Sequence, residues 1–171
     1  DVLFDIGGNV GVYSLYAALR HSRASVVVFE PEYANLHLLR DNIVANQLGD
    51  RVQIYPFALS DRTGVSRLHV QDLTPGAALH TESPGSPRMT ESGERVVMGE
   101  GAWAMTVDEF CASEGLWPNA MKIDVDGGET RVVAGAVKAL SRTELRSIIV
   151  EAGEAGLGVE TRSILAGAGL H

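Results

Sequence analysis

The sequence predicts an α/β fold built on an open, mostly parallel and doubly wound sheet. Two observations support this prediction. Five short apolar runs alternate with amphipathic stretches along the chain, as consecutive β-α-β units require. The runs lack polar alternation, which is typical of strands that helices cover on both faces. A length of 171 residues suits one domain, so we expect residues 1–171 to form a single domain.

The strands and helices can be placed in order along the chain. The second amphipathic stretch is helical because Leu36, Leu39 and Ile43 recur at helical spacing, and Gly49 supplies a stop signal. Thr106 opens a capping-box pattern, which starts a short helix. We expect strands at residues 2–4, 26–29, 52–57, 121–125 and 148–150. We expect helices at 12–19, 33–48, 129–140 and 159–165, and a short one from 106 to about 111 or 113.

One long stretch has no sustained periodicity. It covers residues 72–102 and contains Pro75, Pro84 and Pro87 together with many glycines and serines. A stretch of this length inside a compact domain is either disordered or a functional lid. We therefore expect an irregular insertion or lid at about 72–102, preceded by an extra strand at 65–70.

Composition narrows the classes of partner. The formal net charge is −8 and the chain has no Lys/Arg run, which argues against nucleic acid. Its longest apolar runs are far shorter than the roughly 20 residues that span a bilayer, so we expect no membrane segment. The single cysteine, Cys111, allows no internal disulfide and fits a reducing compartment, so we predict a cytoplasmic protein. Because the chain begins at Asp1, almost directly before a strand, we interpret it as a piece of a longer protein.

A glycine-rich turn follows the first expected strand and carries Asp5, Gly7, Gly8, Asn9 and Gly11. Glycines there let the backbone approach a ligand, and the next helix offers its N-terminus to an anionic group. The dinucleotide pattern G-x-G-x-x-G does not fit, since Asn9 falls on its second glycine when the pattern starts at Gly7. The charge of Asp5 would repel a pyrophosphate and suits a ligand with a cationic end. S-adenosylmethionine (SAM) has an ammonium, a sulfonium and a carboxylate.

Acidic residues follow three other expected strands. Glu30 ends the second strand, where an acidic side chain accepts hydrogen bonds from ribose hydroxyls. Together with the glycine turn, it favours an adenosine-type cofactor. Asp124, Asp126 and Glu129 follow the fourth strand, where the reactive end of such a cofactor would lie, and Glu151 ends the fifth.

These segments together resemble the ordered motif set of the FkbM-type methyltransferase family. The resemblance covers nearly the whole chain and implies a class I, Rossmann-like, SAM-dependent fold. It also implies O-methylation of a hydroxyl on a small metabolite, sugar, glycolipid or natural product, with S-adenosylhomocysteine as the product. The motifs are Asp5-Ile-Gly-Gly-Asn-Val-Gly11, Phe29-Glu-Pro31, Ala58-Leu-Ser-Asp61, Thr106-Val-Asp108, Lys122-Ile-Asp-Val-Asp-Gly127 and Val150-Glu151.

The resemblance also implies roles for single residues. Glu30 would hold the ribose, Ala58 and Ser60 would border the adenine, and Asp124 would lie near the methionine moiety and the methyl group. The chain departs from the family at Gly8, where Ala is usual, and at Asp126, where Glu is usual. The last two strands of the class I fold are expected to be missing. The remaining cofactor-binding residues implied near the methionine end are Asp5, Gly7, Gly8, Asn9 and Gly11.

Catalysis needs alignment of the acceptor with the methyl group and benefits from a base on its hydroxyl. Asp124 is the first candidate for that base, followed by Asp126 and Glu129, with His80 as a fourth. No His/Cys ligand spacing indicates a metal site. Three alternatives stay open: a non-catalytic module that keeps the fold for binding, a nicotinamide-dependent oxidoreductase and a nucleic-acid methyltransferase. Net charge opposes the last one.

Overall fold

The computed structural model describes residues 1–77, 80–83, 95–152 and 156–170. Its larger sheet has five strands in the order β3-β2-β1-β8-β9, and every neighbouring pair is parallel. This confirms the predicted α/β class and the mostly parallel sheet. The strands are β1 Val2–Ile6, β2 Ser25–Phe29, β3 Val52–Tyr55, β8 Ala120–Ile123 and β9 Ser147–Val150.

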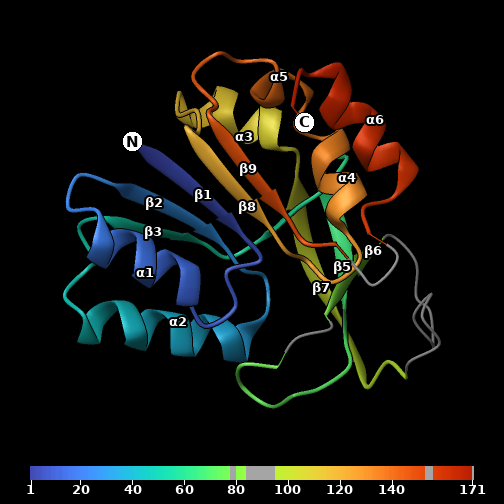
Figure 1. Cartoon of the computed structure of the whole chain (residues 1–171). Helices are drawn as coiled ribbons and strands as arrows, with labels where there is room; N and C mark the ends of the chain where they lie inside the picture. The colour runs from blue at the N-terminus through green and yellow to red at the C-terminus, as the bar shows by residue number, and fades with distance from the viewer. Residues whose placement is uncertain (78–79, 84–94, 153–155, 171) are drawn as a thin grey trace.

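Helices cover both faces of this sheet (Figure 1). Helices α1 and α2 pack on one face, and α3, α4, α5 and α6 pack on the other. The sheet is therefore doubly wound, as predicted. The helices are α1 Val12–Arg20, α2 Tyr33–Ala45, α3 Val107–Glu114, α4 Glu129–Ala134, α5 Val137–Leu140 and α6 Val159–Gly167.

Successive residues of the central strands enter two separate cores. On β2, Val27 and Phe29 join the core under α3 to α6, whereas Val26 and Val28 join the core under α1 and α2. Side chains of a strand alternate between the faces, so strands buried on both faces must be apolar at successive positions. This is why the runs in the sequence show no polar alternation.

A second, four-stranded sheet lies beyond the carboxyl ends of the first (Figure 1). Its strands, in the order β4-β7-β5-β6, are β4 Ala58–Leu59, β5 Gly64–Val70, β6 Thr81–Ser83 and β7 Met98–Met105. The extra strand expected at 65–70 is thus present. The expectation that all of 72–102 is irregular was wrong, since β6 and the start of β7 lie within it. Residues 78–79 and 84–94 lie outside the described part, and a lid there stays a prediction.

The helix expected at 129–140 is divided into α4 and α5. The division occurs at Gly135, where a Cβ would overlap the backbone carbonyl of Ser60 at the end of β4. The glycine therefore lets the helical segment approach the second sheet more closely than any side chain would allow. Periodicity alone did not reveal this contact.

The strand order fixes where a ligand site is expected. The chain runs from β1 to β2 and β3 on one side, then returns to β8 and β9 on the other. Ligands of open α/β sheets bind outside the carboxyl ends of the strands at such a reversal, which here lies between β1 and β8. In the described residues, no helix has the length and apolar character needed to cross a bilayer.

Candidate functional site

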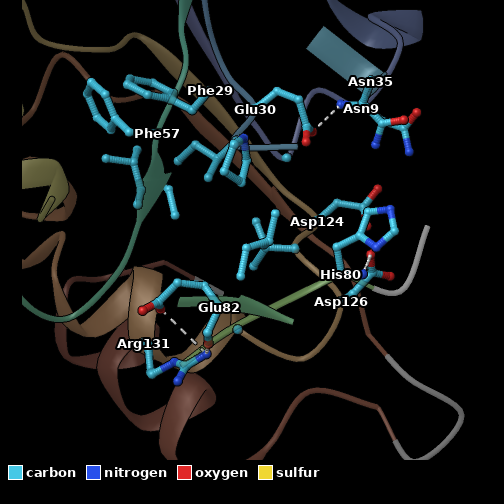
Figure 2. Close-up of a pocket in the computed structure, with 18 of the residues that line it drawn as sticks. Asn9, Phe29, Glu30, Asn35, Phe57, His80, Glu82, Asp124, Asp126 and Arg131 are labelled. Atoms are coloured by element: carbon cyan, nitrogen blue, oxygen red, sulfur yellow. Dashed lines mark hydrogen bonds and ion pairs between the residues drawn. The ribbon is translucent and has the colours of Figure 1, made fainter. Parts of the chain in front are cut away.

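A cavity lies at this reversal point, between the two sheets (Figure 2). Its empty space is about 770 Å³, a volume that includes the open mouth and the solvent there. One wall is apolar and the other is rich in carboxylates. Its lining is Ile6, Gly7, Asn9, Phe29, Glu30, Pro31, Asn35, Phe57, Ala58, Leu59, Leu68, Ala77, His80, Glu82, Asp124, Val125, Asp126, Gly128 and Arg131.

The glycine turn forms the floor of the cavity between β1 and β8. A Cβ on Gly7 would overlap the carbonyl oxygen of Asp124, and Gly7 also has a positive φ of 76°. Glycine alone meets both conditions without strain. Asn9 and Asp126, on opposite sides of the floor, are non-glycine residues with φ of 49° and 53°. Left-handed backbone of this kind concentrates at functional sites.

Glu30 occupies the end of β2 and is buried. Its carboxylate accepts a hydrogen bond from the backbone N–H of Asn9 at 2.8 Å and another from that of Glu32 at 2.9 Å. Burial is the main reason that the pKa of Glu30 rises to about 7. The charged form of Glu30 is thus costly unless a ligand supplies further hydrogen-bond donors.

An asparagine on α2 holds the rim of the cavity beside Glu30. The Asn35 amide donates to the carbonyl of Ala77 at 3.3 Å and accepts from the N–H of Gly76 at 2.8 Å. The Asn9 side chain donates to the same carbonyl at 2.9 Å. The segment before β6 is therefore anchored to both the glycine turn and α2. The sequence did not indicate Asn35, since a polar residue in the first turn of a helix carries no special signal.

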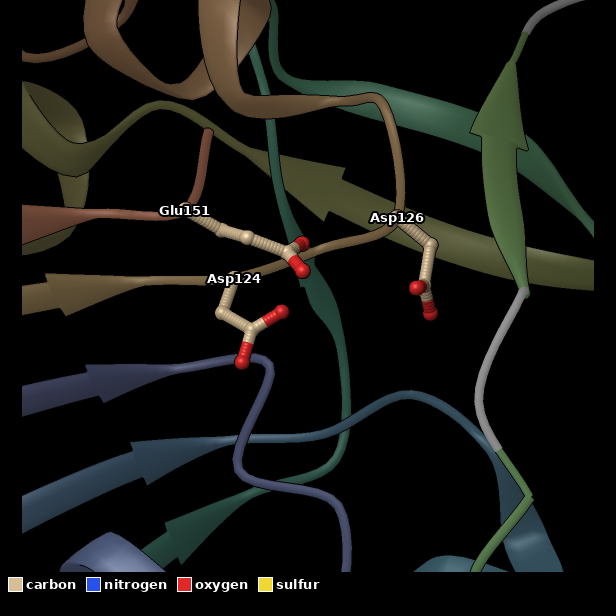
Figure 3. Close-up of side chains that lie close together, drawn as sticks. All are labelled: Asp124, Asp126 and Glu151. Atoms are coloured by element: carbon tan, nitrogen blue, oxygen red, sulfur yellow. The ribbon is translucent and has the colours of Figure 1, made fainter. Parts of the chain in front are cut away.

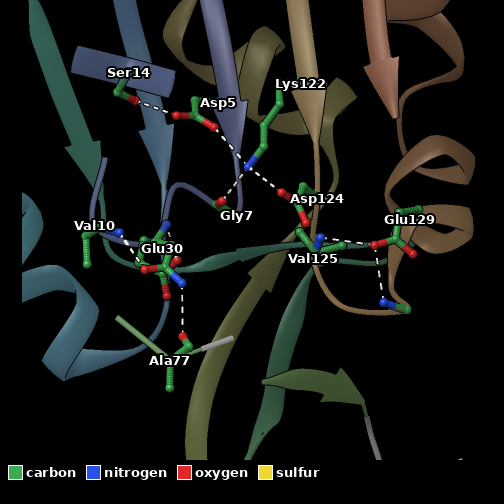
Figure 4. A network of polar contacts seen from close by, with 12 residues as sticks. Asp5, Gly7, Val10, Ser14, Glu30, Ala77, Lys122, Asp124, Val125 and Glu129 are labelled. Carbon is green, nitrogen blue, oxygen red and sulfur yellow. Dashed lines mark hydrogen bonds and ion pairs between the residues drawn. The ribbon is translucent and has the colours of Figure 1, made fainter. Parts of the chain in front are cut away.

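A buried lysine ties β1 to β8 under the cavity floor (Figure 4). Lys122 Nζ donates to the carbonyl of Gly7 at 2.6 Å and lies 3.3 Å from carboxylate oxygens of both Asp5 and Asp124. Asp5 is fully buried and also accepts a hydrogen bond from Ser14 on α1 at 2.6 Å. Within the described part of the chain, oxygen Oδ1 of Asp5 has this ion pair but no hydrogen bond. Asp5 therefore has structural partners that the sequence alone did not reveal.

Three carboxylates gather at the mouth, where β8 and β9 end (Figure 3). Oxygens of Asp124, Asp126 and Glu151 all lie within 4.8 Å of one another. A hydrogen bond with Asp124, partial burial and the neighbouring negative charges, including that of Glu129, together raise the pKa of Glu151 to about 7. Such oxygens would suit a hard cation, but exposed acidic groups of this kind are common without one. The cluster alone assigns no metal.

Glu129 has a different environment from the other acids. Its carboxylate accepts the backbone N–H groups of Val125 at 3.0 Å and Gly127 at 3.2 Å, and so braces the turn between β8 and α4 (Figure 4). A carboxylate in the first helical turn also complements the helix dipole. These contacts give Glu129 a structural role, and its predicted catalytic role stays a prediction.

The far wall contains a buried acid that the sequence did not indicate. Glu82 on β6 accepts a hydrogen bond from Ser60 at 2.8 Å and pairs with Arg131 of α4 at 3.7 Å (Figure 2). Arg131 also donates to the backbone carbonyl of Glu82. The pair links β6 of the second sheet to helix α4 at this wall of the cavity. Arg131 follows the acidic motif by a few residues, a position that could have suggested it, whereas nothing in the sequence marked Glu82.

His80 reaches the cavity from the segment just before β6 (Figure 2). Its backbone N–H donates to Asp126 at 3.3 Å. Both ring nitrogens are buried and have no hydrogen-bond partner among the residues that the structure describes. The imidazole thus offers unused hydrogen-bonding capacity beside the carboxylates.

The structure brings together about half of the predicted site residues. Those in the cavity lining are Gly7, Asn9, Glu30, Ala58, Asp124 and Asp126. Those outside the lining are Asp5, Gly8, Gly11, Ser60 and Glu129.

This chain resembles two methyltransferases in sequence and a third in fold. It is 26% identical over 175 residues to the 31-O-demethyl-FK506 methyltransferase FkbM of Streptomyces tacrolimicus, a match that covers 88% of this chain and 65% of the relative. It is 25% identical over 154 residues to the hexuronic acid methyltransferase AglP of Haloferax volcanii, covering 90% and 57%. The solved precorrin-6y C5,15-methyltransferase of Geobacter metallireducens shares the fold at a TM-score of 0.51 and 14% identity, covering 98% and 62%.

The chain spans less than two thirds of the length of each of these three proteins. The methyltransferase FkbM domain matches residues 5–169, which include the glycine turn, Glu30 and the carboxylates after β8 and β9. Because this match extends over nearly the whole chain, the protein belongs to the methyltransferase FkbM domain family.

Proposed function

We propose that this chain binds SAM and transfers its methyl group to a hydroxyl of a small metabolite, sugar or natural product. The observation that carries the proposal is the spacing of polar groups around one cavity. Glu30 lies at the end of β2, Gly7 forms the floor beside β1, and Asp124 lies at the end of β8. The ribose, the methionine part and the reactive end of SAM need these three kinds of position.

The residues present fit this cofactor. The buried carboxylate of Glu30 suits two ribose hydroxyls, since each would donate a charge-assisted hydrogen bond. The apolar wall at Phe57, Leu59 and Leu68 suits a flat base. Gly7 leaves space that a Cβ would remove. Asp124 suits the cationic ammonium. Asp5 would act through Lys122 and Gly7, because it lies below the floor.

The chain's own groups then have definite tasks. When bound, SAM supplies a methyl group that its sulfonium already activates. The floor and the Glu30 wall orient the cofactor, and alignment of this kind can supply roughly 7–11 kcal/mol. Asp124 and Asp126 face the open mouth, where they can hold the acceptor hydroxyl. A positioned base would contribute about 10²–10⁴-fold more.

The acceptor class is inferred from the relatives. One is named for a hexuronic acid and one for an O-demethylated natural product. Both names support a hydroxylated small molecule as the acceptor here. We keep nucleic acid out of the proposal, since the net charge of −8 would repel a phosphate backbone. A cytoplasmic location stays a prediction.

The first experiment is calorimetric titration of the chain with S-adenosylhomocysteine, with NAD as the control. Micromolar binding of the first and none of the second supports the cofactor proposal. Binding of NAD alone would favour the oxidoreductase. A second experiment incubates the chain with methyl-labelled SAM and glucuronic acid, and label transfer to oxygen supports O-methylation. Tight S-adenosylhomocysteine binding without transfer to any hydroxylated acceptor would favour the non-catalytic module.

A further inference from the structure

We propose that Glu151 is the general base for the acceptor hydroxyl. Asp124 is the neighbouring carboxylate that interacts with it, and Lys122 is the positioning residue that holds Asp124. This inference rests on the proposed methyl transfer and adds to it a residue outside the cavity lining. It commits to one base among the clustered acids.

The position of Glu151 is the first reason. The residue extends β9, its backbone N–H donates to the carbonyl of Ile123 at 2.8 Å, and the backbone of Asp124 is fixed in the same way to Ile6 at 3.1 Å. The two acids therefore stand side by side at the ends of adjacent parallel strands (Figure 3). Asp124 lines the cavity, but Glu151 lies outside it. If the cofactor occupies the cavity, an acceptor that enters beside Asp124 would also meet Glu151, since their carboxylate oxygens lie within 4.8 Å of each other.

The arrangement of charge is the second reason. Lys122 lies 3.3 Å from Asp124 (Figure 4), and its ammonium also lies over the ring of Tyr13 on α1. Opposite charge favours an ionised carboxylate, and two close carboxylates resist ionising together. The shared proton therefore resides on Glu151, for which the described residues supply no paired cation. Among the residues that the structure describes, the other charged groups that act on Glu151 are Asp126 on the loop after β8 and Glu129 on α4, and both are acidic.

This arrangement gives Glu151 the chemistry of a base near neutral pH. Its pKa of about 7 is close to the value at which a general base works best at that pH. In the transfer step the acceptor oxygen bonds to the methyl carbon, the carbon–sulfur bond breaks, and its electron pair stays on sulfur. The hydroxyl proton passes to Glu151, which then releases it to solvent. The products are the methyl ether, S-adenosylhomocysteine and one proton.

The first test needs no acceptor. Carbon-13 NMR of the side-chain carboxyls follows the titration of Glu151 in the wild type and in Asp124→Asn. We expect a midpoint near 7 in the wild type and a lower one in the variant, because the variant lacks the neighbouring charge. A wild-type midpoint near the ordinary value of 4.5 would overturn the proposal. So would a midpoint that Asp124→Asn does not move.

The second test measures kcat for methyl transfer to glucuronic acid at saturating SAM, so that cofactor affinity does not enter the profile. Glu151→Gln should lower kcat by about 10²–10⁴-fold. It should also remove the rise of kcat that the wild type shows as pH increases toward 7. Asp124→Asn should move that rise to lower pH. Glu109→Gln, at an exposed acid on α3, is the matched control and should keep the wild-type profile.

Calorimetry separates this proposal from the function on which it rests. Glu151→Gln should bind S-adenosylhomocysteine as the wild type does. A variant that binds and keeps the wild-type kcat and pH profile overturns the role of Glu151 and leaves the methyl transfer intact. A wild type that binds no S-adenosylhomocysteine refutes the proposed function instead. If glucuronic acid is not methylated, the NMR titration decides alone.

Discussion

A methyl group on Gly8 would overlap Cγ2 of Val28, the fully buried residue behind the glycine turn. The departure from the usual Ala is therefore matched to this β-branched neighbour, which has little rotamer freedom. We expect Gly8→Ala to lower the free energy of unfolding by about 1–3 kcal/mol through overpacking. In a Val28→Ala background the same change should cost less. Urea unfolding of the four proteins in this cycle measures the coupling, and additive costs would contradict the contact.

The ion pair of Lys122 with Asp5 is the second feature at this scale. Both side chains are buried, so removal of one partner leaves an unpaired charge. We expect Lys122→Met to lower the free energy of unfolding by about 3–5 kcal/mol. Adding Asp5→Asn should recover part of this loss, because the asparagine carries no charge and can still accept from Ser14. Chemical denaturation tests both variants, and a double variant no more stable than Lys122→Met would argue against the ion pair.

At the scale of elements, the contact of Gly135 with β4 reverses an ordinary rule. Replacing glycine by alanine in a helical segment normally stabilises it by roughly 1 kcal/mol. Gly135→Ala should instead destabilise the protein, since the new Cβ would meet the backbone of Ser60. Gly167→Ala in α6 is the matched control, because no atom of the described residues lies within 4 Å of a Cβ there. We expect opposite shifts in melting temperature for the two variants. Shifts of the same sign would contradict a close contact between residue 135 and the backbone of Ser60.

The sequence predicted best those elements whose position is set by a run of buried apolar side chains. The central strands of the parallel sheet are apolar because both of their faces are buried. The edge strands β3 and β9 are partly exposed, but their short apolar runs located them as well. Strand β7 was missed because it runs through Met98-Gly-Glu-Gly-Ala-Trp-Ala-Met105 and keeps most of its residues at least partly exposed. A strand with few buried side chains has no apolar run to mark it, and its pairing with β5 is a long-range contact.

The same distinction applies to the candidate site. Glu30 and Asp124 were predicted because they follow strands at the carboxyl edge, which topology alone makes a ligand position. Glu82 and Asn35 reach the cavity through the packing of separate elements, and no local pattern encodes that packing. The structural partners of Asp5 were likewise missed, because Lys122 lies 117 residues further along the chain.

At the scale of the whole molecule, one buried acid should tie folding to pH. The pKa of Glu30 in the folded protein, about 7, lies above its ordinary value of 4.5 because burial disfavours the charged form. The folded state therefore holds this proton more tightly than the unfolded state. The stabilising contribution is fully present below about pH 4.5 and is lost as pH rises through about 7.

We expect the free energy of unfolding of the wild type to fall relative to Glu30→Gln by about 2–3 kcal/mol between pH 4.5 and 8. Urea unfolding of both proteins across this range isolates Glu30, because all other groups are shared. Glu160→Gln, at an exposed acid on α6, corrects for the loss of one carboxylate. A difference that is flat with pH would show that Glu30 titrates as it does in the unfolded chain. Ribose hydroxyls would favour the charged form, so binding of S-adenosylhomocysteine at pH 7 should release a fraction of a proton, which calorimetry in buffers of different ionisation enthalpy can detect.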